Sequence, residues 1–321
     1  MRKRTSNSPG ENSWETQIAE SGEFVRKPTS FRDQIKRDGT TGFQPESGRY
    51  HLYVSLACPW AHRTLILRKL KGLENVIGVD VVDPLLDSRG WSFERSVPGA
   101  TGDRLGGRSL LREIYLASDP DFDGAVTVPV LWDNEREVIV NNESSEIIRM
   151  QNREFDDLSE HPGVDLYPEP LRDRIDALND WIYPEINNGV YRCGFARKQE
   201  AYSNAVRILF AALDRAEAIL ERSRYLCGDH LTEADVRLFT TLVRFDCVYV
   251  SHFKCNIRRL VDYPNLWGYT RDIYQLPGVA ETVNLEHIKL HYFASHRQIN
   301  PFGIVPDGPE LDFTAPHGRG S

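Results

Sequence analysis

Cysteine is scarce in this chain, with five residues among 321, at positions 58, 193, 227, 247 and 255. An odd and scattered set does not form a disulfide framework, and it favours free thiols in a reducing compartment. The residue three positions after Cys58 is alanine, which excludes a redox dithiol of the Cys-x-x-Cys type there. We therefore expect a cytoplasmic protein in which any cysteine chemistry uses a single thiol.

Long apolar runs, excess positive charge and clustered metal ligands are also missing. No segment approaches the length that spans a bilayer, and the basic start at residues 1–4 continues into polar residues, so we expect neither a membrane anchor nor a secretory signal. The net charge of −8 and the pI of about 5.7 argue against a nucleic-acid partner. His287 and His291 are four residues apart but lack a third ligand nearby, so we expect no metal site.

The length of the chain and its hydrophobic content of 40% favour two domains with extensions at both ends. Residues 1–48 are mostly polar and charged, which predicts a partly ordered arm over a core rather than a compact domain. We place the two domains at 49–160 and 165–299. The tail at 300–321, rich in Pro, Gly and Asp, should be extended or loosely held. The arm carries four aromatic anchors: Trp14, Phe24, Phe31 and Phe43.

The first domain begins with a strand-helix-strand pattern. Apolar runs at residues 50–55 and 76–82 flank a helical pattern at 61–73, so the two strands should be parallel. The leucines of the helix predict one apolar face, and the basic residues, among them Arg63 and Lys71, predict a polar face. This arrangement is typical of a thioredoxin-like α/β domain.

A long insertion and a hairpin complete this domain. Residues 83–124 are irregular and dense in Gly, Ser, Arg and Asp, with a short helix possible at 110–116. Short apolar runs at 126–133 and 137–140 predict a hairpin. The next segment, 141–150, predicts a helix with an asparagine or serine as its N-cap.

The second domain is predicted to be all-α, because the apolar residues recur with a helical period beyond residue 165. One helix start is well marked, with Thr232 as N-cap and Asp235 as the acidic member of a capping box. The predicted helices are 171–183, 200–222, 233–250 and 264–274.

Cys58 is the strongest candidate for a reactive residue, because it stands where a strand gives way to a helix and is followed by Pro59. Unpaired N–H groups and the positive end of the helix dipole favour a thiolate, so its pKa should lie below about 8.5. A lone thiol needs an outside thiol to resolve what it captures, and glutathione is the abundant one in a reducing cell. For His62 the sequence favours a structural role over assistance to Cys58.

Several motifs give the chain a resemblance to a known family. A thioredoxin-like half before a helical half, with Val128-Pro129 ahead of the hairpin and Glu143-Ser144 after it, resembles the glutathione transferases. The stretch 53–64, together with Gly90-Trp91, 142–147 and 187–191, is similar to the glutathionyl-hydroquinone reductases, also called the Xi class. The resemblance covers residues 30–310.

The resemblance implies site residues that periodicity alone does not supply. Cys58 corresponds to the family nucleophile, and Pro129 to a cis proline that faces it. The glutathione site would comprise Trp91, Val126, Thr127, Val128, Glu143 and Ser144. Three tyrosines, Tyr191, Tyr249 and Tyr292, match those that line the hydroquinone pocket, and we expect Tyr191 to transfer the proton.

The expected reaction follows from these roles. The Cys58 thiolate would attack the sulfur of a glutathionyl-hydroquinone, and a second glutathione would release oxidised glutathione from the mixed disulfide. The resemblance also implies a homodimer formed through the helical domain.

Two other functions remain open at this point. A general thiol transferase, like the omega class or the glutaredoxins, would use the same Cys58 but would need no tyrosine cluster. A ligand-binding module without activity is the second, and the intact cysteine turn speaks against it.

Overall fold

A mixed four-stranded sheet forms the centre of the first half of the protein. Its strands are β1 (Tyr50–Val54), β2 (Ile77–Val81), β5 (Val130–Asp133) and β6 (Val138–Asn141). They follow the order β2-β1-β5-β6, in which β1 is parallel to β2 and antiparallel to β5. The predicted parallel pair and the predicted hairpin are therefore confirmed. The computed structural model describes residues 17–320, so Trp14 and the basic start of the chain lie outside the described residues.

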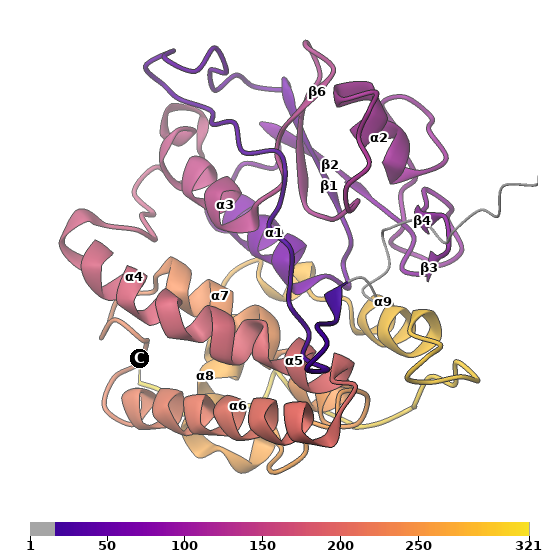
Figure 1. Ribbon diagram of the computed structural model, residues 1–321. Helices are drawn as coiled ribbons and strands as arrows, with labels where there is room; N and C mark the ends of the chain where they lie inside the picture. The colour runs from indigo at the N-terminus through magenta and orange to yellow at the C-terminus, as the bar shows by residue number, and fades with distance from the viewer. Residues whose placement is uncertain (1–16, 321) are drawn as a thin grey trace, which may run out of the picture.

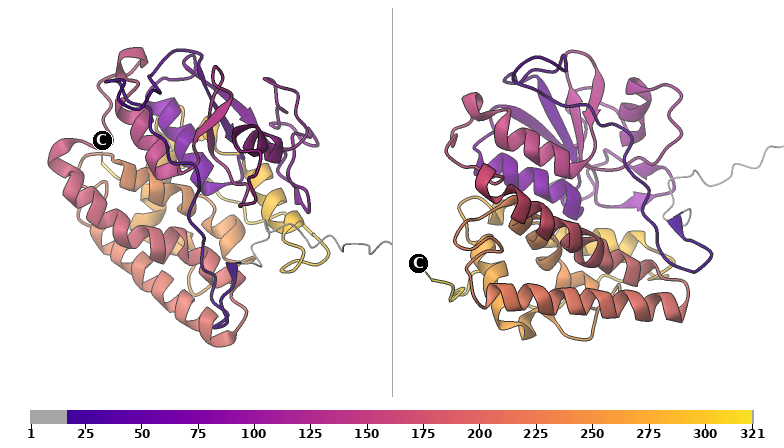
Figure 2. Two further views of the ribbon diagram at one scale, coloured as in Figure 1. Left: turned by 45° about the horizontal axis from the view of Figure 1, so that its top comes forward. Right: turned by 60° about the vertical axis from the view of Figure 1, so that its left-hand side comes forward.

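Two helices separate this sheet from the second half of the protein. In Figure 2, α1 (Pro59–Leu70) and α3 (Ser144–Arg153) lie between the sheet and the helices of the second domain. The polar face predicted for α1 is wrong, because Arg63 and Lys71 are buried. Ala61 and Leu65 of α1 pack in the core of the sheet, and Ile66 and Leu67 pack in the core of the second domain. Arg63 and Lys71 are therefore enclosed with polar partners instead of solvated.

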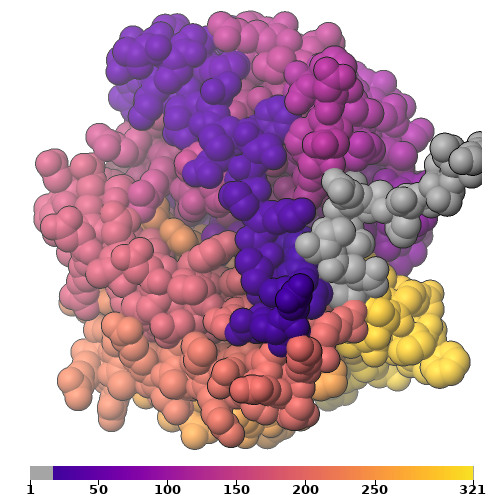
Figure 3. All heavy atoms as spheres, in the orientation of Figure 1, coloured from indigo at the N-terminus to yellow at the C-terminus, as the bar shows by residue number. Residues whose placement is uncertain are grey.

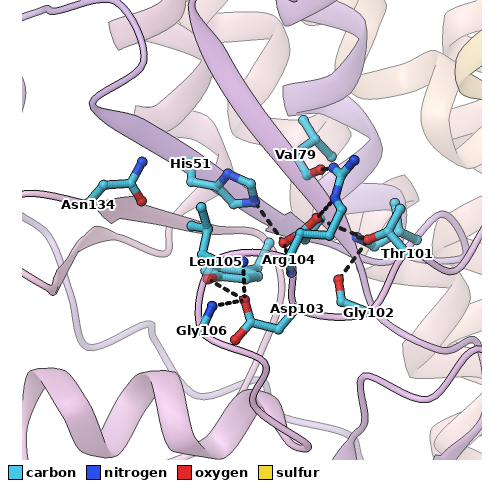
Figure 4. Close-up of polar contacts among 12 residues, drawn as sticks. His51, Val79, Thr101, Gly102, Asp103, Arg104, Leu105, Gly106 and Asn134 are labelled. Atoms are coloured by element: carbon cyan, nitrogen blue, oxygen red, sulfur yellow. Dashed lines mark hydrogen bonds and ion pairs between the residues drawn. The ribbon is translucent and has the colours of Figure 1, made fainter.

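The long insertion is attached to the sheet by a buried carboxylate. Asp80, near the end of β2 and fully buried, accepts hydrogen bonds from Arg104 N–H at 2.8 Å and from the Thr101 hydroxyl at 3.1 Å. Figure 4 shows these contacts, with His51 Nε2 3.2 Å from the same carboxylate. Burial alone would raise the pKa of Asp80, but hydrogen bonds from His51 and Arg104 hold it below its usual value.

The insertion itself holds three short elements. They are β3 (Leu86–Asp87), its antiparallel partner β4 (Gly90–Trp91), and α2 (Leu111–Ser118), which contacts β6 and β4. The short helix expected near 110–116 is thus confirmed. Because Thr101 and Arg104 of the insertion are bonded to Asp80, the part of the loop between β2 and these residues is fixed at both ends, and it can place Trp91 in a defined position.

The second half of the protein is helical, as predicted. Its own hydrophobic core is separate from that of the sheet, and Ile66 and Leu67 of α1 belong to it. No helix in residues 17–320 combines the length and the apolar character needed to cross a membrane. The α-helices are α4 (Arg172–Trp181), α5 (Gly189–Phe195), α6 (Gln199–Leu220), α7 (Glu233–Leu242), α8 (Pro264–Tyr274) and α9 (Leu285–Leu290) (Figure 1).

Three segments of this half have π-helical geometry. They are η4 (Ile182–Asn187), η5 (Phe245–Tyr249) and η8 (His291–Ser295). The single helix predicted at 233–250 is therefore wrong: α7 ends at Leu242, and after a turn the backbone resumes with a bond from Val250 N–H to the Phe245 carbonyl, five residues back. Short 3₁₀ turns complete the fold: η2 (Asp156–Leu158), η3 (Glu169–Leu171), η6 (Leu260–Asp262) and η7 (Ala280–Thr282).

The N-terminal segment, residues 17–48, runs across both halves (Figure 3). Phe24 is buried against Phe195 of the helical half, and the Phe31 carbonyl accepts from Asn142 N–H of the first half at 3.0 Å. The C-terminal tail is extended, as expected. It is also held in place, because Phe313 is buried against Trp267 and Tyr274.

Candidate active site

Cys58 occupies the N-cap position of α1, where the chain leaves β1. Its backbone is extended, with φ −77° and ψ 122°, and Pro59 begins the helix. The thiol Sγ lies 3.6 Å from the Val128 carbonyl oxygen. The next peptide bond, Val128–Pro129, is cis, as the resemblance implied. The structure therefore brings the end of β1 and the start of β5 together at the thiol.

The electrostatics of Cys58 differ from the sequence-based expectation. Burial raises the pKa of the thiol, while the backbone N–H groups of Ala61 and Trp60 and the charges of Arg244 and Arg26 lower it. The residue is half-buried rather than fully enclosed, yet loss of hydration outweighs the helix N-terminus. The predicted pKa below the ordinary value is wrong for the free protein, because the covering second domain could not be read from the local motif.

A cavity of about 680 Å³ opens at Cys58 between the two halves of the protein. We call its two sides the thioredoxin wall and the helical wall. Val126 and Tyr249 are buried and, within residues 17–320, are not among its lining side chains. The thioredoxin wall consists of Cys58, Trp91, Thr127, Val128, Glu143 and Ser144, and the helical wall of Tyr183, Tyr191, Arg237, His291 and Tyr292.

The N-terminus of α3 faces the cavity with a carboxylate and a hydroxyl. Glu143 is the N-cap, so the prediction of an asparagine or serine cap is wrong; its carboxylate accepts from Ser145 N–H at 3.1 Å and from the Thr29 hydroxyl at 3.3 Å. The Ser144 hydroxyl accepts from Arg63 Nη1 at 3.3 Å. Because its oxygen receives this bond, the Ser144 proton remains available for an anionic ligand.

The three predicted tyrosines meet through their hydroxyl groups. Tyr292 lies at the centre, 2.5 Å from the Tyr191 oxygen and 3.0 Å from the Tyr249 oxygen. Burial raises the pKa of each phenol well above 10. All three are therefore protonated at neutral pH and can donate hydrogen bonds but cannot accept protons. Tyr249 is not among the described lining residues, but its hydroxyl contacts Tyr292, which is.

Comparison with known proteins places this arrangement in a family. Residues 57–154 match the model for the glutathione S-transferase N-terminal domain, and residues 199–272 match that for the C-terminal domain. The chain is 56% identical to the glutathionyl-hydroquinone reductase YqjG of Escherichia coli, over 95% of each chain. It is 49% identical to the glutathionyl-hydroquinone reductase PcpF of Sphingobium chlorophenolicum, over 92% of this chain and 93% of that one.

Solved structures support the same family assignment. Glutathione-bound YqjG superposes with a TM-score of 0.88 at 58% identity, covering 90% of this chain and 96% of that one. The Xi transferase of Phanerochaete chrysosporium superposes with a TM-score of 0.89 at 55% identity, covering 91% of this chain and 94% of that one. The chain belongs to the glutathionyl-hydroquinone reductases, the Xi class of glutathione transferases.

In this Xi-class enzyme, Arg244 joins the two halves directly behind the cysteine turn. It follows α7, is fully buried, and donates to the carbonyl oxygens of Ala57 at 2.9 Å and Leu56 at 3.0 Å. It also donates to the Thr240 carbonyl at 2.8 Å. Sequence analysis did not find Arg244, because no local pattern marks an arginine that bonds to backbone atoms about 190 residues away.

His62 points away from Cys58, in agreement with the structural role favoured from the sequence. Its Nδ1 lies 3.0 Å from Arg244, and its Nε2 lies 2.7 Å from the Thr282 hydroxyl. Burial lowers the pKa of His62 well below its usual value, so the ring is neutral.

The N-terminal segment of the reductase forms a further part of the cavity, which sequence analysis also missed. The Arg26 guanidinium lies 4.0 Å above the ring of Trp60 and donates to Asn188 at 3.1 Å. Lys27, Thr29 and other residues of the segment line the opening. Low hydrophobicity predicted an arm over a core, but it carries no signal for which groove the arm covers.

Proposed function

We propose that this protein reduces glutathionyl-hydroquinones to hydroquinones with glutathione as co-substrate, and that Cys58 carries the glutathionyl group between the two. One observation carries the proposal: a half-buried thiol at a helix N-terminus and a cluster of protonated phenols face the same cavity. A thiol alone serves any mixed disulfide, whereas phenols are suited to a quinol ring and its oxygens.

The thioredoxin wall would bind the glutathionyl part of the substrate. The Ser144 hydroxyl and the N-terminus of α3 suit the carboxylate of the γ-glutamyl end, and the Glu143 carboxylate suits its ammonium group. Trp91 and the backbone of residues 126–128 would hold the rest of the tripeptide, with the Val128 carbonyl near the sulfur. These assignments put the scissile bond between Cys58 and the tyrosines.

The chemistry would then proceed in two thiol exchanges. The ring first takes its keto form, so that when Cys58 attacks the glutathionyl sulfur the ring leaves as an enolate and not as a ring carbanion. The oxygens are stabilised by hydrogen bonds from the phenols, and Tyr191 delivers the proton to the ring carbon. A second glutathione cleaves the mixed disulfide at Cys58 and leaves as oxidised glutathione.

Intact-mass analysis tests this proposal. After addition of a glutathionyl-hydroquinone without glutathione, the wild-type protein should gain one glutathionyl group, and Cys58→Ala should gain none. Cys227→Ala, which removes a buried thiol elsewhere, is the matched control and should be labelled like the wild type. A full adduct on Cys58→Ala would exclude Cys58 as the capturing group.

The choice of substrate distinguishes the proposed reductase from a general thiol transferase. The wild-type rates with a glutathionyl-hydroquinone and with a simple glutathione mixed disulfide are compared. Preference for the disulfide alone would favour the general transferase.

We further propose that the protein is a cytoplasmic homodimer. In support, all five cysteines are free thiols, and the family resemblance implies a dimer formed through the helical domain. Light scattering on the purified protein should give twice the 36.7 kDa of one chain; a monomer mass would refute the dimer.

A further inference from the structure

Two histidines one turn apart on the last helical segment make similar contacts but have different surroundings. His287 Nε2 lies 2.8 Å from the Pro98 carbonyl oxygen, and His291 Nδ1 lies 2.9 Å from the Pro84 carbonyl oxygen. Both rings thus attach the insertion to the helical half. His287 is fully buried, whereas His291 lines the cavity beside Trp91 and Tyr292.

The contact with Pro84 fixes the tautomer of His291. A carbonyl oxygen only accepts hydrogen bonds, so Nδ1 of His291 carries the hydrogen, and Nε2 of the neutral ring carries a lone pair. Burial lowers the pKa of His291 to about 4, which keeps the ring neutral near pH 7.

Aromatic contacts hold the His291 ring in one orientation. Trp91 stacks on one face, with centroids 4.9 Å apart and planes at 21°, and the Tyr292 ring meets it edge-on at 5.2 Å. A ring fixed in this way is a preorganised hydrogen-bond acceptor at the wall of the cavity.

The proposed reaction needs such an acceptor. To reach the keto form, a ring hydroxyl of the substrate must lose a proton while the carbon that bears sulfur gains one. The phenols of Tyr191 and Tyr292 are protonated and act as donors. Among the described lining residues, the arginines and Lys27 can only donate, and Glu143 is assigned to the ammonium group of glutathione at the N-terminus of α3.

We propose that His291 is a catalytic residue of this enzyme: its Nε2 accepts the proton of the substrate hydroxyl next to the glutathionyl group. This assignment rests on the proposed function and adds the proton acceptor to it. It also makes a free hydroxyl at that position a requirement for a good substrate.

The protons and electrons are then accounted for. As the hydroxyl proton moves to His291, the oxygen electron pair forms a carbonyl, and the carbon that bears sulfur takes a proton from Tyr191. The Cys58 thiolate forms a disulfide bond with the glutathionyl sulfur, and the electrons of the broken C–S bond return to the ring. The enolate oxygen regains its proton from His291. The thiol proton of the second glutathione restores Tyr191, and its sulfur leaves in oxidised glutathione.

A pair of amide substitutions tests the assignment. In His291→Asn the side-chain nitrogen can replace Nδ1 and keep the bond to Pro84, while the acceptor at Nε2 is lost. In the control His287→Gln the side-chain nitrogen replaces Nε2 and keeps the bond to Pro98. Each variant is assayed with a glutathionyl-hydroquinone and with a glutathione mixed disulfide, which needs Cys58 but no proton acceptor for a ring hydroxyl.

We expect His291→Asn to lower kcat for the glutathionyl-hydroquinone by about 100-fold, the size typical of a lost acid or base, with little change in KM. Disulfide turnover by His291→Asn, and both activities of His287→Gln, should stay near the wild-type values. Unchanged kcat in His291→Asn with the quinol would overturn the assignment, as would equal losses with both substrates, which would show that the ring only supports the site.

A substrate change gives an independent result if His291→Asn does not fold. Methylation of the hydroxyl next to sulfur should slow the wild-type enzyme by about 100-fold as well, since the methyl ether offers no proton. A methyl ether turned over at the full rate would refute the role of His291. If the wild type reduces disulfides but no glutathionyl-hydroquinone at all, the proposed function fails instead, which is a distinguishable result.

Discussion

The two walls of the cavity are built by different means. On the thioredoxin wall, Cys58 and Glu143 are N-caps of α1 and α3, and the Val128 carbonyl is main chain, so this wall works largely through backbone ends. On the helical wall, the groups to which we assign roles are the side chains of Tyr191, Tyr292 and His291.

The backbone geometry of the helical wall is also unusual. His291 and Tyr292 are the first two residues of one π-helical segment, and Tyr191 lies shortly after another. Tyr249, which contacts Tyr292 from behind the wall, ends a third. π-Helical turns are frequent at functional sites, because the widened turn redirects the side chains on it. The contrast teaches that the wall proposed for the tripeptide uses generic helix and strand ends, whereas the wall proposed for the ring uses individually placed side chains.

Removal of Cys58 should have the largest effect, because both walls depend on the thiol. We expect Cys58→Ala to lose at least about 10⁴-fold in kcat with any substrate, as nucleophile deletions do elsewhere. Cys227→Ala should retain activity, measured as oxidised glutathione formed. Substantial turnover by Cys58→Ala would contradict the shared role of the thiol.

Arg244 connects the walls, so its loss should affect both. Arg244→Met leaves the buried carbonyls of Leu56, Ala57 and Thr240 without their donor, and should lower the free energy of unfolding by about 3 kcal/mol or more. Urea denaturation measures the change. Arg68→Met is the control, since Arg68 bonds carbonyls within the first half only. It should also lower stability but leave the reactivity of Cys58 unchanged.

Tyr191→Phe should impair the task of the helical wall and leave that of the thioredoxin wall intact. It removes the phenol proton from the helical wall, so kcat with a glutathionyl-hydroquinone should fall by about 100-fold, while reduction of a mixed disulfide continues. Tyr263→Phe, which loses a bond to Asp214, is a control for the loss of a phenol elsewhere. Equal losses on both substrates would contradict separate tasks for the two walls.

Ser144→Ala should affect only the thioredoxin wall, and more mildly. Loss of one hydrogen bond to a carboxylate should weaken glutathione binding by about tenfold, seen as a higher KM with both substrates. Ser145→Ala is the matched control, because its hydroxyl donates to Glu143. The prediction fails if Ser144→Ala raises KM no more than Ser145→Ala does.

The smallest effect concerns the pH dependence of Cys58 in the free enzyme. Because burial raises the pKa of the thiol, the thiolate fraction is still growing at neutral pH. The rate of alkylation by iodoacetamide should therefore keep rising from pH 7 to 9, by up to about tenfold per pH unit. A plateau below pH 7 would show that the helix N-terminus outweighs burial. In Arg244→Met the rise should move to higher pH, since a nearby positive charge is lost.

Local sequence signals predicted the elements but not their environment. The strand at β1, the hairpin and α8 follow from apolar period and turn residues, and the Thr232 N–H bond to Asp235 at 2.8 Å follows from one short motif. Burial of Arg63 could not be predicted in this way. A helix that is covered on two sides can show the same spacing of apolar residues as a helix with one exposed face. Its arginines can be buried because distant residues accept their hydrogen bonds, as Asn187 does for Arg63.

The candidate site shows the same limit. The strand-to-helix turn predicts Cys58, motifs of a known family predict Tyr191 and Tyr292, and the structure brings all three to one cavity. The raised pKa of Cys58 and the contacts of Arg244 arise from the packing of one half on the other, which no window of sequence contains.

The bonds of Arg244 to main-chain oxygens have a consequence for how this enzyme can diverge. Since the guanidinium contacts Leu56 and Ala57 through their carbonyls, mutations that change those two side chains leave the contacts in place, whereas the arginine has no substitute of equal geometry. Chimaeras that exchange the helical half between relatives should thus inherit a working cysteine turn whenever the donor half brings this arginine with it.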